Sequence, residues 1–252
     1  MAKKKKRINE YDQNPAEKIQ RSYKKKKRVR RFRVFFLILV VIGLGYYFYS
    51  PYSRLNTIEI TGNQYISQDS IRAVMGYQED SIRLFVSRMK IKNSLEAMSG
   101  VQSVSVNKVP FKGLKITIKE NSAIAYQENE GTLTVIFDDG SLAEVSDQNL
   151  YRDVQSLPKL SQFTDGAILQ QFATAFAQVE SSVRLQMSEI LFEPLETDPL
   201  RVRMISNDSK ESYVRIDEMV YQLSYYNGIV SQNPGNCYFD FLDSNVYQRA
   251  CD

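Results

Sequence analysis

The sequence predicts an α+β protein with a disordered basic tail, one transmembrane helix, a small β-α-α-β-β domain and a larger β-rich α+β domain. Three features predict this order: an uncharged apolar run from Val34 to Tyr49, a basic tract before it, and short alternating strands mixed with amphipathic helices after it. We expect the boundaries at 1–31 for the cytoplasmic tail, 32–50 for the span, 51–122 for the small domain and 123–252 for the larger one.

The apolar run is long enough to cross a bilayer. A helix over 32–50, at about 1.5 Å per residue, spans close to the ~30 Å of hydrocarbon in a bilayer. Eleven Leu, Ile, Val and Phe side chains between 34 and 49 favour insertion by about 3 to 7 kcal/mol. The alternative is a buried core helix, but such a helix rarely lacks a polar stripe over four turns.

Charge is divided unequally across this run. Residues 1–31 carry fourteen Lys or Arg against three Asp or Glu, whereas residues 34–252 carry eighteen against twenty-six. Lys and Arg beside a span stay in the cytoplasm, so we predict a cytoplasmic N-terminus and extracytoplasmic C-terminal domains. The cations expected to contact anionic membrane lipid are Lys24, Lys25, Lys26, Lys27, Arg28, Arg30 and Arg31.

Two other interpretations of the N-terminal region are disfavoured. A cleaved signal peptide needs small residues at its cleavage site, but the run ends in the bulky residues Tyr46 to Tyr49. Nucleic-acid binding is disfavoured because the basic tail lacks interleaved aromatic residues and adjoins the span. Its charge and scarcity of aliphatic side chains predict disorder.

The composition argues against catalysis and against a metal centre. Histidine is absent, which removes the commonest general base and metal ligand. The sequence has no Gly-rich phosphate loop and no Gly-x-Ser-x-Gly elbow, and its two Cys are too few for a metal cluster. Asp138-Asp139-Gly140 is typical of a hairpin turn. We therefore expect no enzyme activity and no cofactor, although paired carboxylates keep a cell-wall hydrolase as a minor alternative.

The first exported segment predicts two helices on one face of a small sheet. Ile58 and Ile60 alternate in a strand, and Ser67 is a plausible N-cap for a first helix. A second helix places Ile91, Leu95 and Met98 on one face and ends near Gly100. Two further strands follow, with Val104 and Val106 in the first, a turn at 110–113, and Leu114, Ile116 and Ile118 in the second.

This segment resembles the POTRA domain of the DivIB/FtsQ family of bacterial cell-division proteins. The run Ile-Glu-Ile-Thr-Gly-Asn-Gln-Tyr-Ile-Ser at 58–67 is similar to its opening, and 95–106 and 114–121 are similar to its close. Ser99-Gly100 departs from the family, which often has Pro-Trp or Pro-Tyr there. The resemblance covers roughly 30–245 and implies a single-pass protein with a β-rich interaction domain after the POTRA-like domain.

The larger domain is expected to alternate short strands with two amphipathic helices. We predict strands at 123–127, 133–137, 142–145, 189–192, 200–205 and 212–216, with a turn at Asn207-Asp208. One helix carries the apolar stripe Ile168, Phe172, Ala175, Phe176, Val179 and Val183, and the other carries Met219, Val220, Leu223, Tyr226 and Val230. Both stripes are interpreted as core packing.

The last sixteen residues contain a predicted hairpin and both cysteines. A turn centred on Ser244 would place Phe239 opposite Arg249 and Cys237 opposite Cys251. Outside the cell this geometry would allow a disulfide worth roughly 3 kcal/mol, but two free thiols remain the alternative.

Strands near a chain end often lie at a sheet edge, where another protein can add a strand. The resemblance implies that this region binds a DivIC/FtsB-like partner in that way, with FtsL-like proteins in the same assembly. The residues predicted to form or flank the edge are Tyr238, Phe239, Asp240, Phe241, Leu242 and Tyr247.

The function predicted from the sequence is a membrane-anchored scaffold of the divisome at the septum, which binds other bitopic division proteins outside the membrane. The alternative from another class is an extracytoplasmic wall- or peptide-binding surface module. The third interpretation is a cell-wall hydrolase, but no convergent polar cluster supports it.

Overall fold

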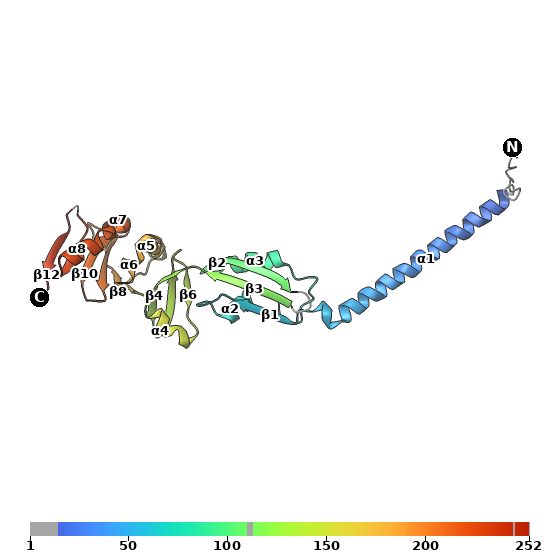
Figure 1. The fold of residues 1–252 in the computed structure, drawn as a ribbon, viewed down its shortest axis with the longest axis horizontal. Coiled ribbons are helices and arrows are strands. Elements are labelled where there is room, and N and C mark those ends of the chain that lie inside the picture. Colours follow the sequence, from blue (N-terminus) through green and yellow to red (C-terminus); the bar gives the residue numbers. More distant parts are fainter. Residues whose placement is uncertain (1–14, 110–112, 244, 252) are drawn as a thin grey trace, which may run out of the picture. The chain divides into compact units, whose positions relative to one another are not determined.

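The computed structural model describes residues 15–109, 113–243 and 245–251 (Figure 1). The chain divides into two compact units, one of Met1–Arg54 with Ile82–Leu84 and one of Leu55–Ser81 with Phe85–Asp252. The fold is α+β, as the sequence predicts: an apolar helix precedes a small mixed domain and a strand-rich larger domain.

Helix α1, Pro15–Tyr49, contains the predicted span. Its part Lys27–Tyr49 has 23 residues and is the one helix in the described chain that is long and apolar enough to cross a membrane. The Leu, Ile, Val and Phe side chains of this part, apart from the half-buried Phe48, are exposed around the helix, and none of the apolar stretch is buried inside the protein. A helix that is apolar on all sides and has no protein core against it is suited to lipid.

The helix begins further toward the N-terminus than the sequence predicts. Residues 15–31 are helical in α1 where we expected a tail without regular structure, and residues 1–14 of that tail lie outside the described residues. Lys, Arg, Gln and Glu are good helix formers. Adding turns to an existing helix avoids the costly nucleation step, so a high charge does not prevent the extension.

A short 3₁₀ turn follows the span. Ser50 caps η2, Pro51–Ser53, and the Ser53 hydroxyl donates to the carbonyl oxygen of Ser50 at 2.8 Å. The next residue, Arg54, forms an isolated antiparallel bridge with Ile82, and the N–H of Arg83 donates to the carbonyl oxygen of Ser53 at 2.7 Å.

The small domain has the predicted β-α-α-β-β order. Its three-stranded sheet has the order β1-β3-β2, with β1 parallel and β2 antiparallel to the central strand β3. Ile71 and Met75 of the first helix and Ile91 and Leu95 of the second lie in a core with alternate residues of the strands. The elements are β1 (Thr57–Thr61), α2 (Gln68–Met75), α3 (Arg88–Glu96), β2 (Val101–Val109) and β3 (Gly113–Glu120).

Two polar side chains fix the loop between β1 and α2. Ser67 is the N-cap of α2, as predicted, and accepts a hydrogen bond from the N–H of Ser70 at 3.1 Å. The carboxylate of Glu120, at the end of β3, accepts backbone N–H bonds from Gln64, Tyr65 and Ile66 at 2.9 to 3.0 Å. One carboxylate thus satisfies three backbone donors of this loop.

The larger domain contains a nine-stranded sheet in the order β12-β11-β10-β9-β8-β7-β4-β5-β6. Most neighbours are antiparallel, but β4–β7, β7–β8 and β10–β11 are parallel. The strands are β4 (Ala123–Asn129), β5 (Thr132–Phe137), β6 (Leu142–Glu144), β7 (Lys159–Ser161), β8 (Met187–Phe192), β9 (Arg201–Ser206), β10 (Glu211–Arg215), β11 (Asn236–Asp240) and β12 (Tyr247–Ala250).

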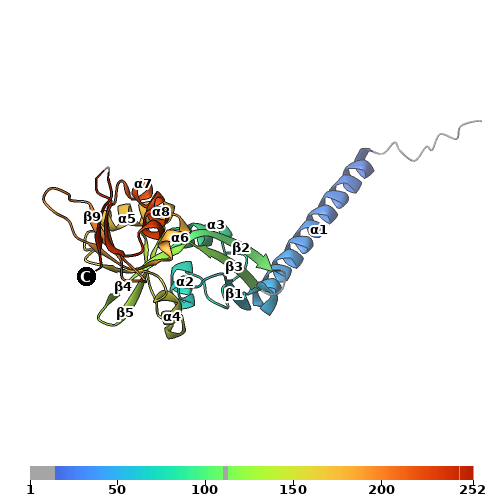
Figure 2. The same ribbon diagram turned by 60° about the vertical axis from the view of Figure 1, so that its left-hand side comes forward.

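Helices cover this sheet in two places. The helices α5, α7 and α8 lie together near the C-terminal strands (Figure 1), and their apolar side chains share one core with Phe239 and Val214 of the sheet. The short α4 contacts β5 at the other end (Figure 2), where Val154 joins a separate cluster with Leu133 and Phe137. The helices are η3 (Gln148–Leu150), α4 (Tyr151–Val154), α5 (Gly166–Gln178), α6 (Ser181–Arg184), α7 (Met219–Ser224) and α8 (Tyr226–Gln232).

Both predicted long helices are interrupted. The first ends at Gln178, because Val179 is extended, and α6 then carries Val183. The second is divided into α7 and α8 at Tyr225. The stripe residue Val220 is 40 % exposed, so it is not the core residue that we predicted.

Candidate functional site at the C-terminal sheet edge

The edge of the large sheet is formed by β12, and β11 is the second strand. β11 pairs with β10 in parallel on one side and with β12 antiparallel on the other. No other strand in the described part of the chain pairs with β12. The predicted stretch 238–242 therefore flanks the edge, because the chain turns back after it and adds one more strand.

The pairing of β11 with β12 differs from the predicted register by one residue. Phe239 lies opposite Gln248, and Tyr238 lies opposite Arg249. A bulge between Asn236 and Tyr238 gives β11 one extra residue, Cys237. The predicted pairing of Phe239 with Arg249 was wrong because Asp240 already lies opposite Tyr247, so the turn is centred half a residue before Ser244. Alternation along the strand does not reveal the bulge, which shifts the register once more at Cys237.

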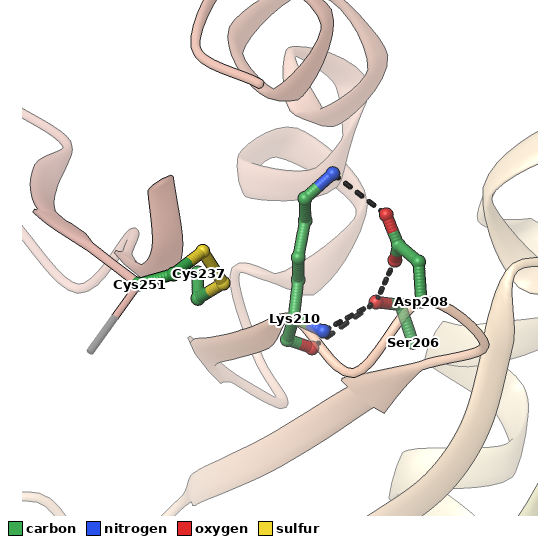
Figure 3. Close-up of a disulfide and its surroundings, with 5 residues drawn as sticks. All are labelled: Ser206, Asp208, Lys210, Cys237 and Cys251. Carbon is green, nitrogen blue, oxygen red and sulfur yellow. Dashed lines mark hydrogen bonds and ion pairs between the residues drawn. A yellow bond between two sulfur atoms is a disulfide. The ribbon is translucent and has the colours of Figure 1, made fainter. Parts of the chain in front are cut away.

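A disulfide joins Cys237 to Cys251, with a Cα–Cα distance of 4.8 Å (Figure 3). The bulge places Cys237 beside the end of β12, where the N–H of Cys251 donates to the carbonyl oxygen of Gly235 at 3.1 Å. The edge strand is thus attached to its neighbour both by backbone hydrogen bonds and by a covalent bond.

A hydrogen-bonded turn lies in the neighbourhood of this disulfide (Figure 3). Asp208, between β9 and β10, accepts bonds from the Lys210 ammonium at 2.6 Å and from the Ser206 hydroxyl at 2.5 Å. These two donors lower the pKa of the Asp208 carboxyl below its ordinary value. The charged carboxylate therefore stabilises the predicted turn at 207–208.

Tyrosine rings form a ladder across the last three strands. The ring centres of Tyr213 and Tyr238 are 5.3 Å apart, and those of Tyr238 and Tyr247 are 6.1 Å apart. The guanidinium of Arg249 lies 5.0 Å from the centre of the Tyr238 ring, and that of Arg201 lies 5.0 Å from the centre of the Tyr213 ring. The first pair is tilted and the second is edge-to-face, and aromatic and cation–π contacts of this kind stabilise the pairing of the last three strands.

Tyr238 and Tyr247 differ in what they offer a partner. Tyr247 is 64 % exposed at the edge, whereas Tyr238 is half-buried between its neighbours. Burial, and then the charge of nearby Asp240, raises the pKa of the Tyr238 phenol. The phenol therefore stays neutral at physiological pH, and its hydroxyl donates to the Asp240 carboxylate at 3.4 Å.

Two of the predicted partner-binding residues are core residues. Phe239 is fully buried and Phe241 is 3 % exposed, with the Phe241 ring 6.1 Å from that of Tyr226. These side chains cannot contact a partner directly, and they act on the site only by holding β11 in place. Leu242 is half-buried, and its N–H donates to the Asp240 carboxylate at 2.9 Å.

A pocket beside the end of β11 was not predicted from the sequence. It has a volume of about 340 Å³, and Tyr221 and Tyr225 of α7 and its C-cap are exposed side chains on its wall. The sequence does contain one indication of this pocket: the two tyrosines are four residues apart, so they lie on one helix face outside the apolar stripe. The lining residues are Glu218, Tyr221, Gln222, Tyr225, Phe241, Leu242, Asp243 and Val246.

The remaining predicted positions lie far from this edge in the sequence. Lys27, Arg28, Arg30 and Arg31 are exposed on α1, and Lys24 to Lys26 belong to the same helix. The side chains of these last three lysines are outside the described residues.

The structure gives no sign of a metal centre in the part of the chain that it describes, where no three Cys, Asp or Glu side chains gather around a common point. Asp139, the most prominent paired carboxylate, is used in the turn between β5 and β6. It accepts bonds from the side chain of Asn121 at 2.6 Å and from the N–H and hydroxyl of Ser141 at 2.9 and 2.6 Å.

Taken together, the fold and this edge define a class: proteins with one N-terminal apolar helix, a small β-α-α-β-β domain and a strand-rich domain that ends in an open edge strand. Comparison with known proteins identifies residues 53–121 as a POTRA domain of the FtsQ type. The chain is similar over most of its length to proteins named cell division protein DivIB, so the resemblance to the DivIB/FtsQ family is confirmed.

Three relatives illustrate the similarity. DivIB of Listeria monocytogenes is 24 % identical over 213 residues, which cover 84 % of this chain and 78 % of the relative. DivIB of Bacillus subtilis is 24 % identical over 230 residues, covering 91 % and 85 %. DivIB of Streptococcus pneumoniae serotype 4 is 28 % identical over 210 residues, covering 81 % and 51 %.

A solved structure, the major extracytoplasmic domain of DivIB from Geobacillus stearothermophilus in its trans isomer, matches 45 % of this chain and 93 % of that one. Its sequence identity is 24 % and its TM-score is 0.38. The relatives and the apolar helix α1 indicate a membrane-anchored protein with a role in cell division.

Proposed function

We propose that this chain is a non-catalytic scaffold of the divisome, anchored by α1 with its N-terminus in the cytoplasm and its folded domains outside. Its partners are DivIC/FtsB-like and FtsL-like bitopic division proteins, and its place is the division septum. The observation that carries the proposal is the open edge strand β12, Tyr247–Ala250, fastened to the sheet but unpaired on its outer side among the described residues.

The charge distribution supports this orientation. Residues 1–31 carry fourteen Lys or Arg, and the last of them adjoin the apolar part of α1. The exported part is acidic, and acidic domains do not oppose translocation, whereas Lys and Arg near a span do.

The backbone geometry supports strand addition at β12. The N–H of Cys251 points toward β11, since it donates to Gly235. Inward and outward groups alternate along an antiparallel strand, so the N–H groups of Gln248 and Ala250 are expected to point outward. An incoming strand would pair with these groups and gain its affinity from backbone hydrogen bonds.

The side chains at the edge are suited to a protein partner with both apolar and charged or polar groups. The exposed Tyr247 ring offers apolar area with a polar tip, and Arg249 offers a cation beside it. Tyr and Arg are enriched where binding energy concentrates in protein interfaces. The pocket lined by Tyr221 and Tyr225 also includes residues of the loop between β11 and β12. If the partner chain extends beyond the added strand, this pocket would bind one of its side chains.

The direct test uses proline at an outward-facing N–H. Ala250→Pro removes that donor at an exposed position, and proline is tolerated on the open side of an edge strand. Loss of one backbone hydrogen bond, about 0.5 to 1.5 kcal/mol, should weaken binding of a DivIC/FtsB-like ectodomain by about 2- to 13-fold.

The matched control is Ala250→Val, which keeps the N–H and adds apolar area. Binding of the two variants is measured by titration calorimetry, with circular dichroism to verify the fold. Equal affinity of both variants and the parent chain would contradict strand addition at β12.

A further inference from the structure

A basic and apolar segment lies within the otherwise acidic exported part. Residues 81–92 read Ser-Ile-Arg-Leu-Phe-Val-Ser-Arg-Met-Lys-Ile-Lys, with four Lys or Arg and no carboxylate. Residues 34–252 as a whole carry an excess of Asp and Glu. Glu79 and Asp80 directly precede the segment, and Lys92 forms an ion pair with Glu96 at 3.6 Å, so the local positive charge is concentrated at residues 83–90.

Three large apolar side chains of this segment are directed to solvent. Leu84, Phe85 and Met89 are 62, 66 and 67 % exposed, whereas Val86 and Ile91 of the same segment are buried in the domain core. The buried pair holds the segment in place, so exposure of the other three does not arise from a loose loop. Three large exposed apolar side chains within six residues favour a contact surface here.

Backbone bonds hold the start of the segment near the end of the span. The N–H of Arg83 donates to Ser53 at 2.7 Å, and Ile82 forms a bridge with Arg54. Ser53 is four residues beyond Tyr49, the last residue of α1. A chain reaches at most about 3.6 Å per residue, so Ser53 lies within about 14 Å of the helix end.

This distance places the segment within reach of the membrane surface. The end of α1 carries Tyr46, Tyr47 and Tyr49, and tyrosine favours the headgroup level of a bilayer. The headgroup layer is about 5 to 8 Å deep on each side, and the field of an anionic surface extends a further ~8 Å at physiological ionic strength.

We propose that residues 82–90 form a second membrane contact, on the outer leaflet. Leu84, Phe85 and Met89 enter the interfacial layer, while the exposed Arg88 and Lys90 contact the phosphates of anionic phospholipid. Apolar side chains combined with Lys and Arg, and without carboxylates, are typical of segments that lie in a membrane interface. A protein partner would not require every charge to have the same sign, and continuity with the span favours lipid as the occupant.

The contact would restrict how the POTRA domain turns above the membrane. A span alone leaves a domain free to rotate about its linker, whereas a second attachment 30 residues later in the chain removes part of this freedom. This contact is independent of the β12 edge, and it rests on the part of the proposed function that places α1 in the bilayer with the folded domains outside.

The chain has no tryptophan, so a single introduced Trp reports on one site. Phe85→Trp is placed in the full chain, which is reconstituted in vesicles of phosphatidylcholine with or without phosphatidylglycerol. We expect its emission maximum to shift to shorter wavelength in the phosphatidylglycerol vesicles, and lipids brominated near the headgroup to quench it. Tyr221→Trp, at a residue that is 69 % exposed on α7, is the control and should show neither effect.

Variants that remove charge distinguish contact with lipid from burial within the protein. In the Phe85→Trp chain, replacing Arg88 and Lys90 by Ser should reduce the quenching in phosphatidylglycerol vesicles, whereas Lys119→Ser, at an exposed position on β3, should not. Circular dichroism verifies the fold of each variant. Emission at solvent-exposed wavelengths with no quenching in either vesicle would overturn the proposal. A shift that occurs only when a partner ectodomain is added would overturn it too and would assign the segment to a protein partner.

Discussion

Cys237 and Cys251 are joined across the last two strands, and the bulge in β11 is what brings them together. If the register of Tyr238 with Arg249 continued without a bulge, Cys237 would lie opposite Ala250 and not beside Cys251. The covalent bond therefore secures the edge strand on which the proposed partner site depends.

Removing this bond should lower stability and loosen β12. The bond closes a loop of 14 residues in sequence separation, for which the loop-closure model gives about 3 kcal/mol. A variant with both cysteines replaced by Ser should unfold at a lower urea concentration than the parent chain. Dithiothreitol should lower the urea midpoint of the parent chain to nearly that of the variant. Insensitivity of the parent to dithiothreitol would contradict a stabilising bridge.

Tyr247 and Phe239 should respond to alanine in opposite ways. Tyr247→Ala removes an exposed ring at the edge, so it should weaken partner binding and leave the melting temperature nearly unchanged. Phe239→Ala leaves a cavity in the core and should cost about 3 to 5 kcal/mol of unfolding free energy. Thermal melts and binding titrations on the same preparations measure both, and a destabilised Tyr247→Ala would show that its ring is structural.

Glu120 should contribute more to the unfolding free energy of the POTRA domain than an exposed ion pair does. Its carboxylate accepts three backbone N–H bonds, so Glu120→Ala leaves these donors without their partner and should cost about 2 to 3 kcal/mol. Glu59→Ala, which removes an exposed ion pair with Lys115, should cost less than about 1 kcal/mol. Urea unfolding compares the two, and equal losses would contradict the role of Glu120.

Stability should also depend on the charge of Asp208. Its folded pKa lies below the ordinary value, because Lys210 and Ser206 donate to the carboxylate. The contribution to stability is therefore present above the ordinary pKa of an Asp, about 4, and is lost as pH falls through the lower folded value.

Asp208→Asn should thus be less stable than the parent at pH 7, and the difference should shrink as pH falls below about 4. Urea midpoints at several pH values measure this difference. A gap between the two chains that stays constant down to pH 2 would show that the charge of Asp208 contributes nothing.

The sequence was most informative where regular patterns extend over several residues. The alternation of Leu114, Ile116 and Ile118, and the cap at Ser67, predicted the POTRA strands and helix start because burial and capping act locally. The three-residue strand β7, Lys159–Ser161, was missed, whereas the equally short β6, Leu142–Glu144, was predicted because the Asp139-Gly140 turn marks its start.

The candidate site was harder to predict than the fold. Tyr238 and Phe239 are neighbours in the sequence, yet one lies in the tyrosine ladder and the other is fully buried. Which of two alternating faces is the core, and which strand is the outermost, depends on how distant strands pair. Neither the bulge at Cys237 nor the edge position of β12 is encoded in a local pattern.

The most direct test of the scaffold account is photocrosslinking in dividing cells. A photoreactive benzoylphenylalanine at position 247, on the β12 edge, should form an adduct with a small bitopic division protein. The same group at position 142, on the β6 strand at the opposite edge of the sheet, should not. Adducts at both edges, or none at position 247 in cells that divide normally, would contradict a partner site at β12.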